Sequence, residues 1–243
     1  MESTQHPATT VDEVARGIYR ISTPVPPEAM PGGFSFNQYL VAAEKPLLYH
    51  TGPRKLFDQI CEAIERIIPV SRLAYIGFSH VEADECGSLN EFLSCAPNAV
   101  PLCGQVAAMV SIDDIALRPA KAMADGEVLD LGGHRIRWIA TPHLPHGWEC
   151  SMAFEETTGT LLCGDLFTQP GHDNPPLTEA DILEPSEVFR HQMDYFAHSP
   201  DTRHHLQRLA DLRPSTLACM HGSAWRGDGA SLLGQLSDRL TQR

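Results

Sequence analysis

The 243-residue chain combines 42% hydrophobic with 20% charged residues, a balance typical of a globular protein with a sizeable core. Its 18 Lys and Arg against 31 Asp and Glu give a formal net charge of −13 with neutral His. Because such a charge repels phosphate backbones, we expect no nucleic-acid partner. No apolar run approaches the ~20 residues of a membrane helix, and the polar residues 1–10 hold no signal-peptide core. We therefore expect a cytoplasmic protein without a membrane partner.

Two residue counts bear on chemistry. The seven Cys include no CxxC pair, which argues against a zinc ribbon or a disulfide framework. In a reducing compartment we expect these thiols to be buried as small hydrophobic side chains. The twelve His are many for a chain of this length, and we expect some of them to take part in chemistry.

The hydrophobic pattern predicts a loose segment over residues 1–13 and a single domain over residues 14–243. Two hairpins are indicated by the turn pairs Gly132–Gly133 and Thr158–Gly159 between short apolar runs. Paired strands followed by alternating helices and strands predict an α/β domain with two sheets inside and helices outside. In chain order, strands are predicted at 17–21, 36–41, 47–49, 73–78, 99–102, 128–131, 135–140, 151–155, 160–163 and 216–220, and helices at 55–68, 87–95, 105–110, 186–196, 203–212 and 229–240.

Acidic and imidazole side chains directly follow the predicted strand at 73–78. His80, Glu82 and Asp84 stand at alternate positions, and in an extended chain alternate side chains point to one side. Carboxylates gathered around an imidazole would repel one another unless a cation lay between them. The alternative is a solvated acidic loop, since many of the 31 acidic residues must lie at the surface. This segment alone leaves both interpretations open.

Three later strands also end in candidate ligands. In chain order they are followed by His143 and His146, by Asp165, and by His221. Because strand ends commonly carry functional sites, four such ends indicate one shared site. We expect His146 to be the ligand, because it directly precedes the Gly-Trp start of the next predicted strand, and His143 to lie beside it.

The order of these motifs resembles the metallo-β-lactamase superfamily, most of which carries HxHxDH in the first motif. Here that motif reads His80-Val81-Glu82-Ala83-Asp84. Glu82 in place of the second His resembles the branch typified by flavodiiron proteins, the oxygen-binding di-iron proteins. The likeness runs from about residue 17 to about residue 225, and its motifs agree in order, spacing and type. It implies an αββα sandwich of two mixed β-sheets flanked by helices.

The resemblance also implies a ligand set for two iron ions. One iron would be held by three residues, the second by two, and one carboxylate would bridge them. The first set would be His80, Glu82 and His146, the bridge Asp165, and the second set Asp84 and His221.

One residue departs from the pattern of that branch, in which a His follows the Asp of the first motif. This chain has Glu85 there. We expect Glu85 to coordinate the second metal or to hydrogen-bond to its water, and we take Asp84 and Glu85 as the catalytic candidates. The alternative is that Glu85 turns toward solvent, because neighbours on an extended segment point to opposite sides. A tight turn near Gly87 would let both carboxylates face the metal.

The donor types agree with the resemblance. Three imidazoles with three or four carboxylates form a hard, oxygen-rich set that suits iron or manganese better than zinc, which favours thiolates. Four ionised carboxylates would balance the charge of two divalent ions. The small number of ligands leaves an open position for dioxygen or water.

The first functional hypothesis is therefore a non-haem di-iron protein that binds dioxygen or nitric oxide, as a sensor or as an oxidoreductase. The chain has no Gly-rich or Ser/Thr-rich phosphate loop that would hold a flavin. We therefore expect no flavin on this chain alone and electrons from a separate flavoprotein or another donor. The resemblance also implies a homodimer.

Two other hypotheses remain. The first is a metal-dependent hydrolase of an ester, lactone or thioester, in which Asp84 would direct the proton. Glu82 discriminates between this and the redox hypothesis, because hydrolases of the superfamily usually have His at that position. The second is a metal-binding protein without turnover that acts through partners, for which Glu85 is the only support.

Overall fold

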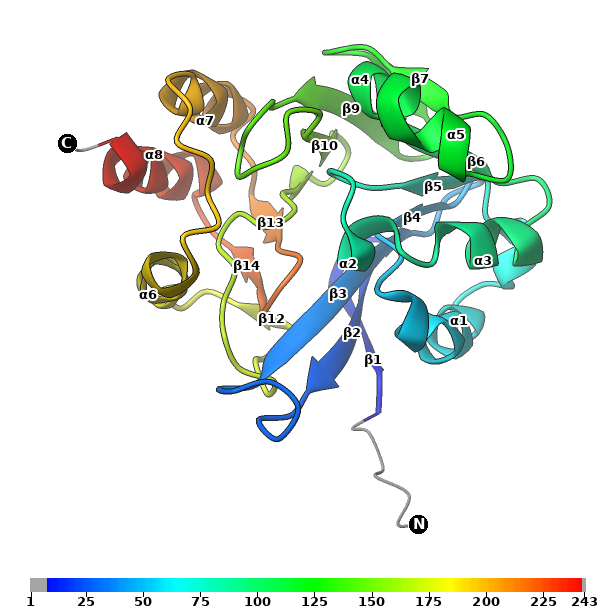
Figure 1. Ribbon diagram of the computed structural model, residues 1–243, viewed down its shortest axis with the longest axis horizontal. Coiled ribbons are helices and arrows are strands. Elements are labelled where there is room, and N and C mark those ends of the chain that lie inside the picture. The colour runs from blue at the N-terminus through cyan, green and yellow to red at the C-terminus, as the bar shows by residue number, and fades with distance from the viewer. Residues whose placement is uncertain (1–7, 242–243) are drawn as a thin grey trace.

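The computed structural model describes residues 8–241, which form two mixed seven-stranded β-sheets with helices on their outer sides (Figure 1). The predicted αββα sandwich is confirmed. The first sheet is built from the N-terminal half of the chain and the second from the C-terminal half. None of the helices in residues 8–241 is long and apolar enough to cross a bilayer.

The first sheet begins as an antiparallel meander from β1 to β4 and continues with parallel strands from β4 to β7. Parallel neighbours need a crossover connection, and helices α1 (Phe57–Glu65) and α3 (Leu89–Cys95) lie in two of these connections. The strands lie in sequence order: β1 Thr10–Ala15, β2 Ile18–Val25, β3 Phe34–Val41, β4 Leu47–Tyr49, β5 Tyr75–Gly77, β6 Val100–Gly104 and β7 Lys121–Met123.

The second sheet has the strand order β12-β14-β13-β11-β10-β9-β8. Its central strands β11 and β13 are parallel, so both carboxyl ends lie at the same edge. The strands are β8 Val128–Asp130, β9 Arg135–Ala140, β10 Ser151–Glu155, β11 Thr160–Leu162, β12 Leu177–Thr178, β13 Thr216–Ala218 and β14 Ala224–Arg226.

Helices cover the outer faces, with α1 and α3 beside the first sheet and α6, α7 and α8 beside the second (Figure 1). A π-helical turn at Ala108–Ile112 joins α4 to α5. The helices are α1 Phe57–Glu65, α2 Ala83–Cys86, α3 Leu89–Cys95, α4 Gln105–Ala107, α5 Asp113–Ile115, α6 Leu183–Met193, α7 Thr202–Asp211 and α8 Gly229–Thr241, with 3₁₀ turns at Arg54–Leu56 and Val70–Arg72.

Apolar side chains fill three layers of the sandwich. Ile60 of α1 and Phe92 of α3 pack against the first sheet, and Leu233 of α8 packs against the second. Between the sheets, Tyr49 and Trp138 belong to one buried cluster to which both sheets contribute. Burial of this much apolar surface is the dominant stabilising contribution to such a fold. The sandwich therefore holds the strand ends of both sheets in fixed relative positions.

The prediction of a loose segment over residues 1–13 is wrong for residues 10–13, which lie in β1; residues 1–7 are outside the described part of the chain. β1 is held by backbone pairing with β2, which needs no continuous apolar pattern. Helix α2 and strands β7, β12 and β14 were not predicted. Each has two to four residues, too few to produce a hydrophobic period.

Candidate metal centre

The candidate ligands converge where strands of both sheets end. His80 follows β5 of the first sheet, whereas His146, Asp165 and His221 follow β9, β11 and β13 of the second. Gly164 turns the chain into Asp165 with φ +53°, a left-handed conformation that favours glycine. A Cβ at this position would lie 3.0 Å from Ser79 Oγ, so the segments that carry His80 and Asp165 are in close contact.

Four side chains form a first cluster. His80 Nε2 and His146 Nε2 each lie 3.5 Å from Asp165 Oδ2. Glu82 completes the group, with Oε1 3.2 Å from His146 Nε2 and Oε2 3.8 Å from His80 Nε2. This is the set that the family resemblance implied for the first metal, together with the bridging residue.

A second cluster lies on the other side of Asp165. His221 Nε2 is 3.3 Å from Asp165 Oδ1 and 3.4 Å from Asp84 Oδ2. The two carboxylate oxygens of Asp165 therefore face different clusters, Oδ2 toward the first and Oδ1 toward the second. A carboxylate in this position can bind two adjacent metal ions at once.

The clusters have the properties of a metal centre. Donor atoms within 4.8 Å of one another form three groups: His80, His146 and Asp165; His80, Glu82 and Glu85; and Asp84, Glu85 and His221. Several of these atoms are buried without a hydrogen-bond partner, among them His80 Nε2, His146 Nε2, Asp165 Oδ1 and both Glu85 oxygens. Buried polar atoms ordinarily have partners, and divalent cations between the carboxylates would provide them. The residues present therefore fit two divalent metal ions with a preference for oxygen and nitrogen.

Hydrogen bonds outside the clusters orient two of the histidines. His50 Nε2 accepts from the Ser79 backbone N–H at 3.3 Å and lies 3.0 Å from the Ser79 hydroxyl, whose oxygen lies 2.9 Å from His80 Nδ1. This network assigns a proton to His80 Nδ1 and leaves the Nε2 lone pair facing the carboxylates. His221 Nδ1 lies 2.8 Å from the Ser35 carbonyl oxygen, which orients its Nε2 in the same way.

The charges of the clustered groups shift their proton affinities strongly. Close contacts with the imidazoles of His146 and His80 lower the pKa of Glu82 to about 2. Burial alone would lower the pKa of His221, but the adjacent carboxylates of Asp165 and Asp84 raise it to about 9. A proton on His221 thus occupies the position in which a divalent ion would bind, and metal binding would release it.

The segment that carries the acidic ligands is not extended throughout, as the alternation argument required. Glu82 is extended, with φ −134° and ψ 168°, but Ala83–Cys86 form the helical turn α2. Because consecutive side chains on a helix are separated by about 100° and not by 180°, Asp84 and Glu85 both reach the second cluster. The alternative of a Glu85 that turns to solvent is wrong, because the Glu85 side chain is 0% exposed. The acidic segment is solvated only in part, with Glu82 50% and Asp84 22% exposed.

His143 and His146, the two histidines of the Pro-rich turn, have different surroundings. His146 lies in the first cluster, whereas His143 is exposed and donates only its backbone N–H, to Gly147 O at 2.8 Å. His50 is buried and bonded to Ser79, the neighbour of His80. Burial lowers the pKa of His50 to about 3, so it remains neutral in this network.

Aromatic residues from both halves of the chain also border the centre, and the sequence analysis missed them. The Tyr195 hydroxyl donates to the backbone oxygen of Asp165 at 3.1 Å. The Phe34 ring lies 4.3 Å from the ring of His221, and Phe189 of α6 stacks on Phe34 at 5.6 Å. Their role depends on how α6 and the following loop pack over the sheet, for which the sequence carries no local signal.

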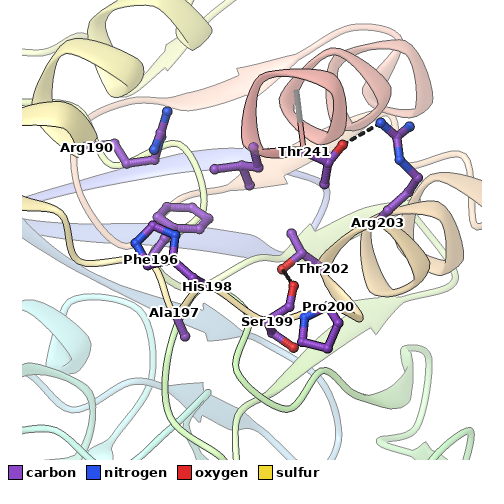
Figure 2. A pocket seen from close by; sticks show the side chains of 10 residues that line it. Arg190, Phe196, Ala197, His198, Ser199, Pro200, Thr202, Arg203 and Thr241 are labelled. Atoms are coloured by element: carbon purple, nitrogen blue, oxygen red, sulfur yellow. Dashed lines mark hydrogen bonds between the residues drawn. The ribbon is translucent and has the colours of Figure 1, made fainter. Parts of the chain in front are cut away.

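A cavity of about 500 Å³ lies elsewhere, between α6, α7 and α8 (Figure 2). Its charged residues already have partners: Arg190 pairs with Glu187 at 2.7 Å, and Arg203 hydrogen-bonds to Thr241. None of the candidate ligands lines it. The chemistry of the molecule is therefore concentrated at the strand ends.

Comparison with known proteins identifies the family. Residues 34–222 match the family described as "ODP family beta lactamase", and this range includes every candidate ligand. The chain belongs to this family. The resemblance found in the sequence is therefore confirmed at the level of family and fold.

Curated relatives of this ODP-family chain are longer proteins. The chain is 28% identical over 196 residues to diflavin flavoprotein A 1 of Nostoc sp., an alignment that covers 78% of this chain and 33% of that protein. It is 27% identical over 212 residues to the anaerobic nitric oxide reductase flavorubredoxin of Pectobacterium atrosepticum, an alignment that covers 83% of this chain and 41% of that protein. The chain thus spans about a third to two fifths of the length of these relatives.

Solved structures agree on the fold of the ODP-family domain. A flavo di-iron protein mutant from Thermotoga maritima superposes with a TM-score of 0.82 at 18% identity, covering 97% of this chain and 62% of that one. The flavodiiron protein from Giardia intestinalis superposes with a TM-score of 0.80 at 18% identity, covering 96% of this chain and 60% of that one.

Proposed function

We propose that this chain is the metal-binding domain of a non-haem di-iron protein that binds and reduces dioxygen or nitric oxide. The observation that carries the proposal is the Asp165 carboxylate, whose two oxygens face two separate groups of imidazole and carboxylate donors. Glu82 at the position where hydrolases of the superfamily usually have His supports redox chemistry over hydrolysis. The names of the relatives, a flavorubredoxin that reduces nitric oxide and flavodiiron proteins, agree with it.

His80, Glu82 and His146 would hold one iron, Asp84 and His221 the other, and Asp165 would bridge them. Bound iron would supply electrons to a dioxygen or nitric oxide molecule at an open position, which imidazole and carboxylate ligands alone cannot do. Manganese is the second choice for this oxygen-rich donor set, and zinc the third.

The protein groups shield one side of the site and leave the other side open to solvent. His80, Asp165 and His221 have side chains at most 7% exposed, so bulk water is excluded on their side. Glu82 is 50% exposed and Asp84 22%, and both touch the clusters. Reduction of dioxygen to water consumes protons, which solvent would deliver on the side of Glu82 and Asp84.

Electrons would come from a separate donor, since the chain carries no recognisable flavin-binding loop. A flavoprotein is the donor class we propose, and a homodimer the assembly. We also propose a cytoplasmic location, which agrees with seven free cysteines, five of them buried.

The test is metal analysis followed by gas consumption. The protein purified without oxygen from iron-fed cells should carry close to two irons per chain. Reduced with a chemical donor, it should consume dioxygen or nitric oxide. Stoichiometric zinc with hydrolysis of a thioester or lactone would instead establish the hydrolase hypothesis.

A further inference from the structure

Glu85, at which this chain departs from the pattern of the flavodiiron branch, lies between the two ligand clusters. Its carboxylate is within 4.8 Å of donor atoms of His80 and Glu82, and also within 4.8 Å of donor atoms of Asp84 and His221. The first pair belongs to the first cluster and the second pair to the second. Glu85 thus shares with Asp165 the property of reaching both.

The Glu85 carboxyl group is buried beside the carboxylate of Asp84, which cannot neutralise its charge. The side chain is 0% exposed, and neither Oε1 nor Oε2 has a hydrogen-bond partner. No Lys or Arg in residues 8–241 forms an ion pair with it. A buried carboxylate without partners is costly, and a cation bound between the two clusters would provide them.

The backbone holds Glu85 in this place independently of its side chain. Thr51 N–H donates to the Glu85 carbonyl oxygen at 2.8 Å, and Cys86 N–H donates to Glu82 O at 3.0 Å across the turn of α2. The carboxylate therefore points inward because the helical turn is anchored to the first sheet.

We propose that Glu85 is a second bridging carboxylate, which would bind both metal ions together with Asp165. The inference rests on the proposed two-metal centre and adds a ligand common to both ions. Glu85 replaces a neutral imidazole by an anion, so four carboxylates face the two ions. The added negative charge stabilises the oxidised, more highly charged state of the pair.

The decisive measurement is the affinity for each ion in turn. Metal-free protein is titrated with Mn(II) by calorimetry and by electron paramagnetic resonance, which needs no turnover. Glu85→Ala should weaken binding of both the first and the second ion, each by more than the ~10–100-fold typical of residues that only orient a ligand. His146→Ala and His221→Ala are the matched controls, because each removes a ligand from one cluster alone.

The pattern of losses separates the interpretations. If Glu85→Ala copies His221→Ala and retains the first ion, Glu85 serves only the second cluster and the bridge is refuted. Unchanged binding of both ions refutes any ligand role. If the unaltered protein binds two ions, the proposed function survives either result; if it binds no pair of ions, the proposed function and the bridge both fail.

A second variant keeps the test independent of folding defects. Glu85→Gln has the same shape without the charge, so the metal-free variant should melt higher than the metal-free parent, by about 2–4 °C for each kcal/mol gained. Its gain in melting temperature on adding Mn(II) should be smaller than that of the parent. A Gln variant that melts lower without metal, or gains as much with it, contradicts the bridging role.

Discussion

Replacing Ser79 by Ala tests whether the hydrogen bonds behind His80 prepare the metal centre. The Ser79 hydroxyl lies 2.9 Å from His80 Nδ1 and 3.0 Å from His50 Nε2, and all three residues are buried. Without it, His80 loses the acceptor that directs its Nε2 lone pair toward the carboxylates. Changes of this kind cost ~10–100-fold in metal affinity, which is about 1.4–2.7 kcal/mol.

The same substitution should lower the stability of the metal-free protein. A buried donor or acceptor left without a partner costs roughly 1–3 kcal/mol. For a chain of this size each kcal/mol lowers the melting temperature by about 2–4 °C, so we expect a drop of roughly 2–12 °C. Thermal unfolding followed by circular dichroism measures the drop, and calorimetric titration with Mn(II) measures the affinity.

Ser88→Ala is the matched control. Ser88 is also buried, but its hydroxyl has no hydrogen-bond partner, so its removal should be neutral or slightly stabilising and should leave metal affinity unchanged. If Ser79→Ala binds Mn(II) within twofold of the parent and melts like Ser88→Ala, the orienting role assigned to Ser79 is refuted.

Four further outcomes follow from the structure. His146→Ala should empty the first metal position in metal analysis, whereas His143→Ala should retain it; the reverse result would make His143 the ligand. In the metal-free protein, burial alone would lower the pKa of His221, but neighbouring carboxylates raise it from 6.5 to about 9. Protonated His221 stabilises the fold fully below pH 6.5, and this contribution is lost as the pH rises toward 9. The melting temperature of the metal-free protein should therefore fall over that range, and it should fall less in His221→Ala. Gly164→Ala should lower the free energy of unfolding by about 1 kcal/mol or more, because φ is +53° and the new Cβ would press on Ser79. Chemical denaturation measures this change, and an unchanged free energy of unfolding would show that the turn relaxes without cost. Protein at a free metal concentration one hundred times the Kd should be more stable than chelator-treated protein by about 2.7 kcal/mol in the free energy of unfolding. A melting temperature that is unchanged by the chelator would contradict a bound metal.

Much of the fold was predictable because its signals are local. Apolar runs such as Leu47–Tyr49 and the turn pair Gly132–Gly133 specify a strand or a hairpin within a few residues. The spacing of polar residues after strands identified His80, Asp165 and His221 as candidates, and their order carried the family resemblance. Their roles as ligands stay predictions, although the structure brings them together.

By itself, the sequence determined most of the longer strands and helices, and which side chains stand at their ends, because both depend on neighbours along the chain. The meeting of these side chains depends on sheet order and packing between residues far apart in sequence, which no local pattern encodes. The tertiary structure alone decided that the two oxygens of Asp165 face different clusters, and that Ser79 lies between His50 and His80. It also decided the direction of Glu85, because the four-residue turn α2 is too short to predict and is held in place by Thr51 from another part of the chain.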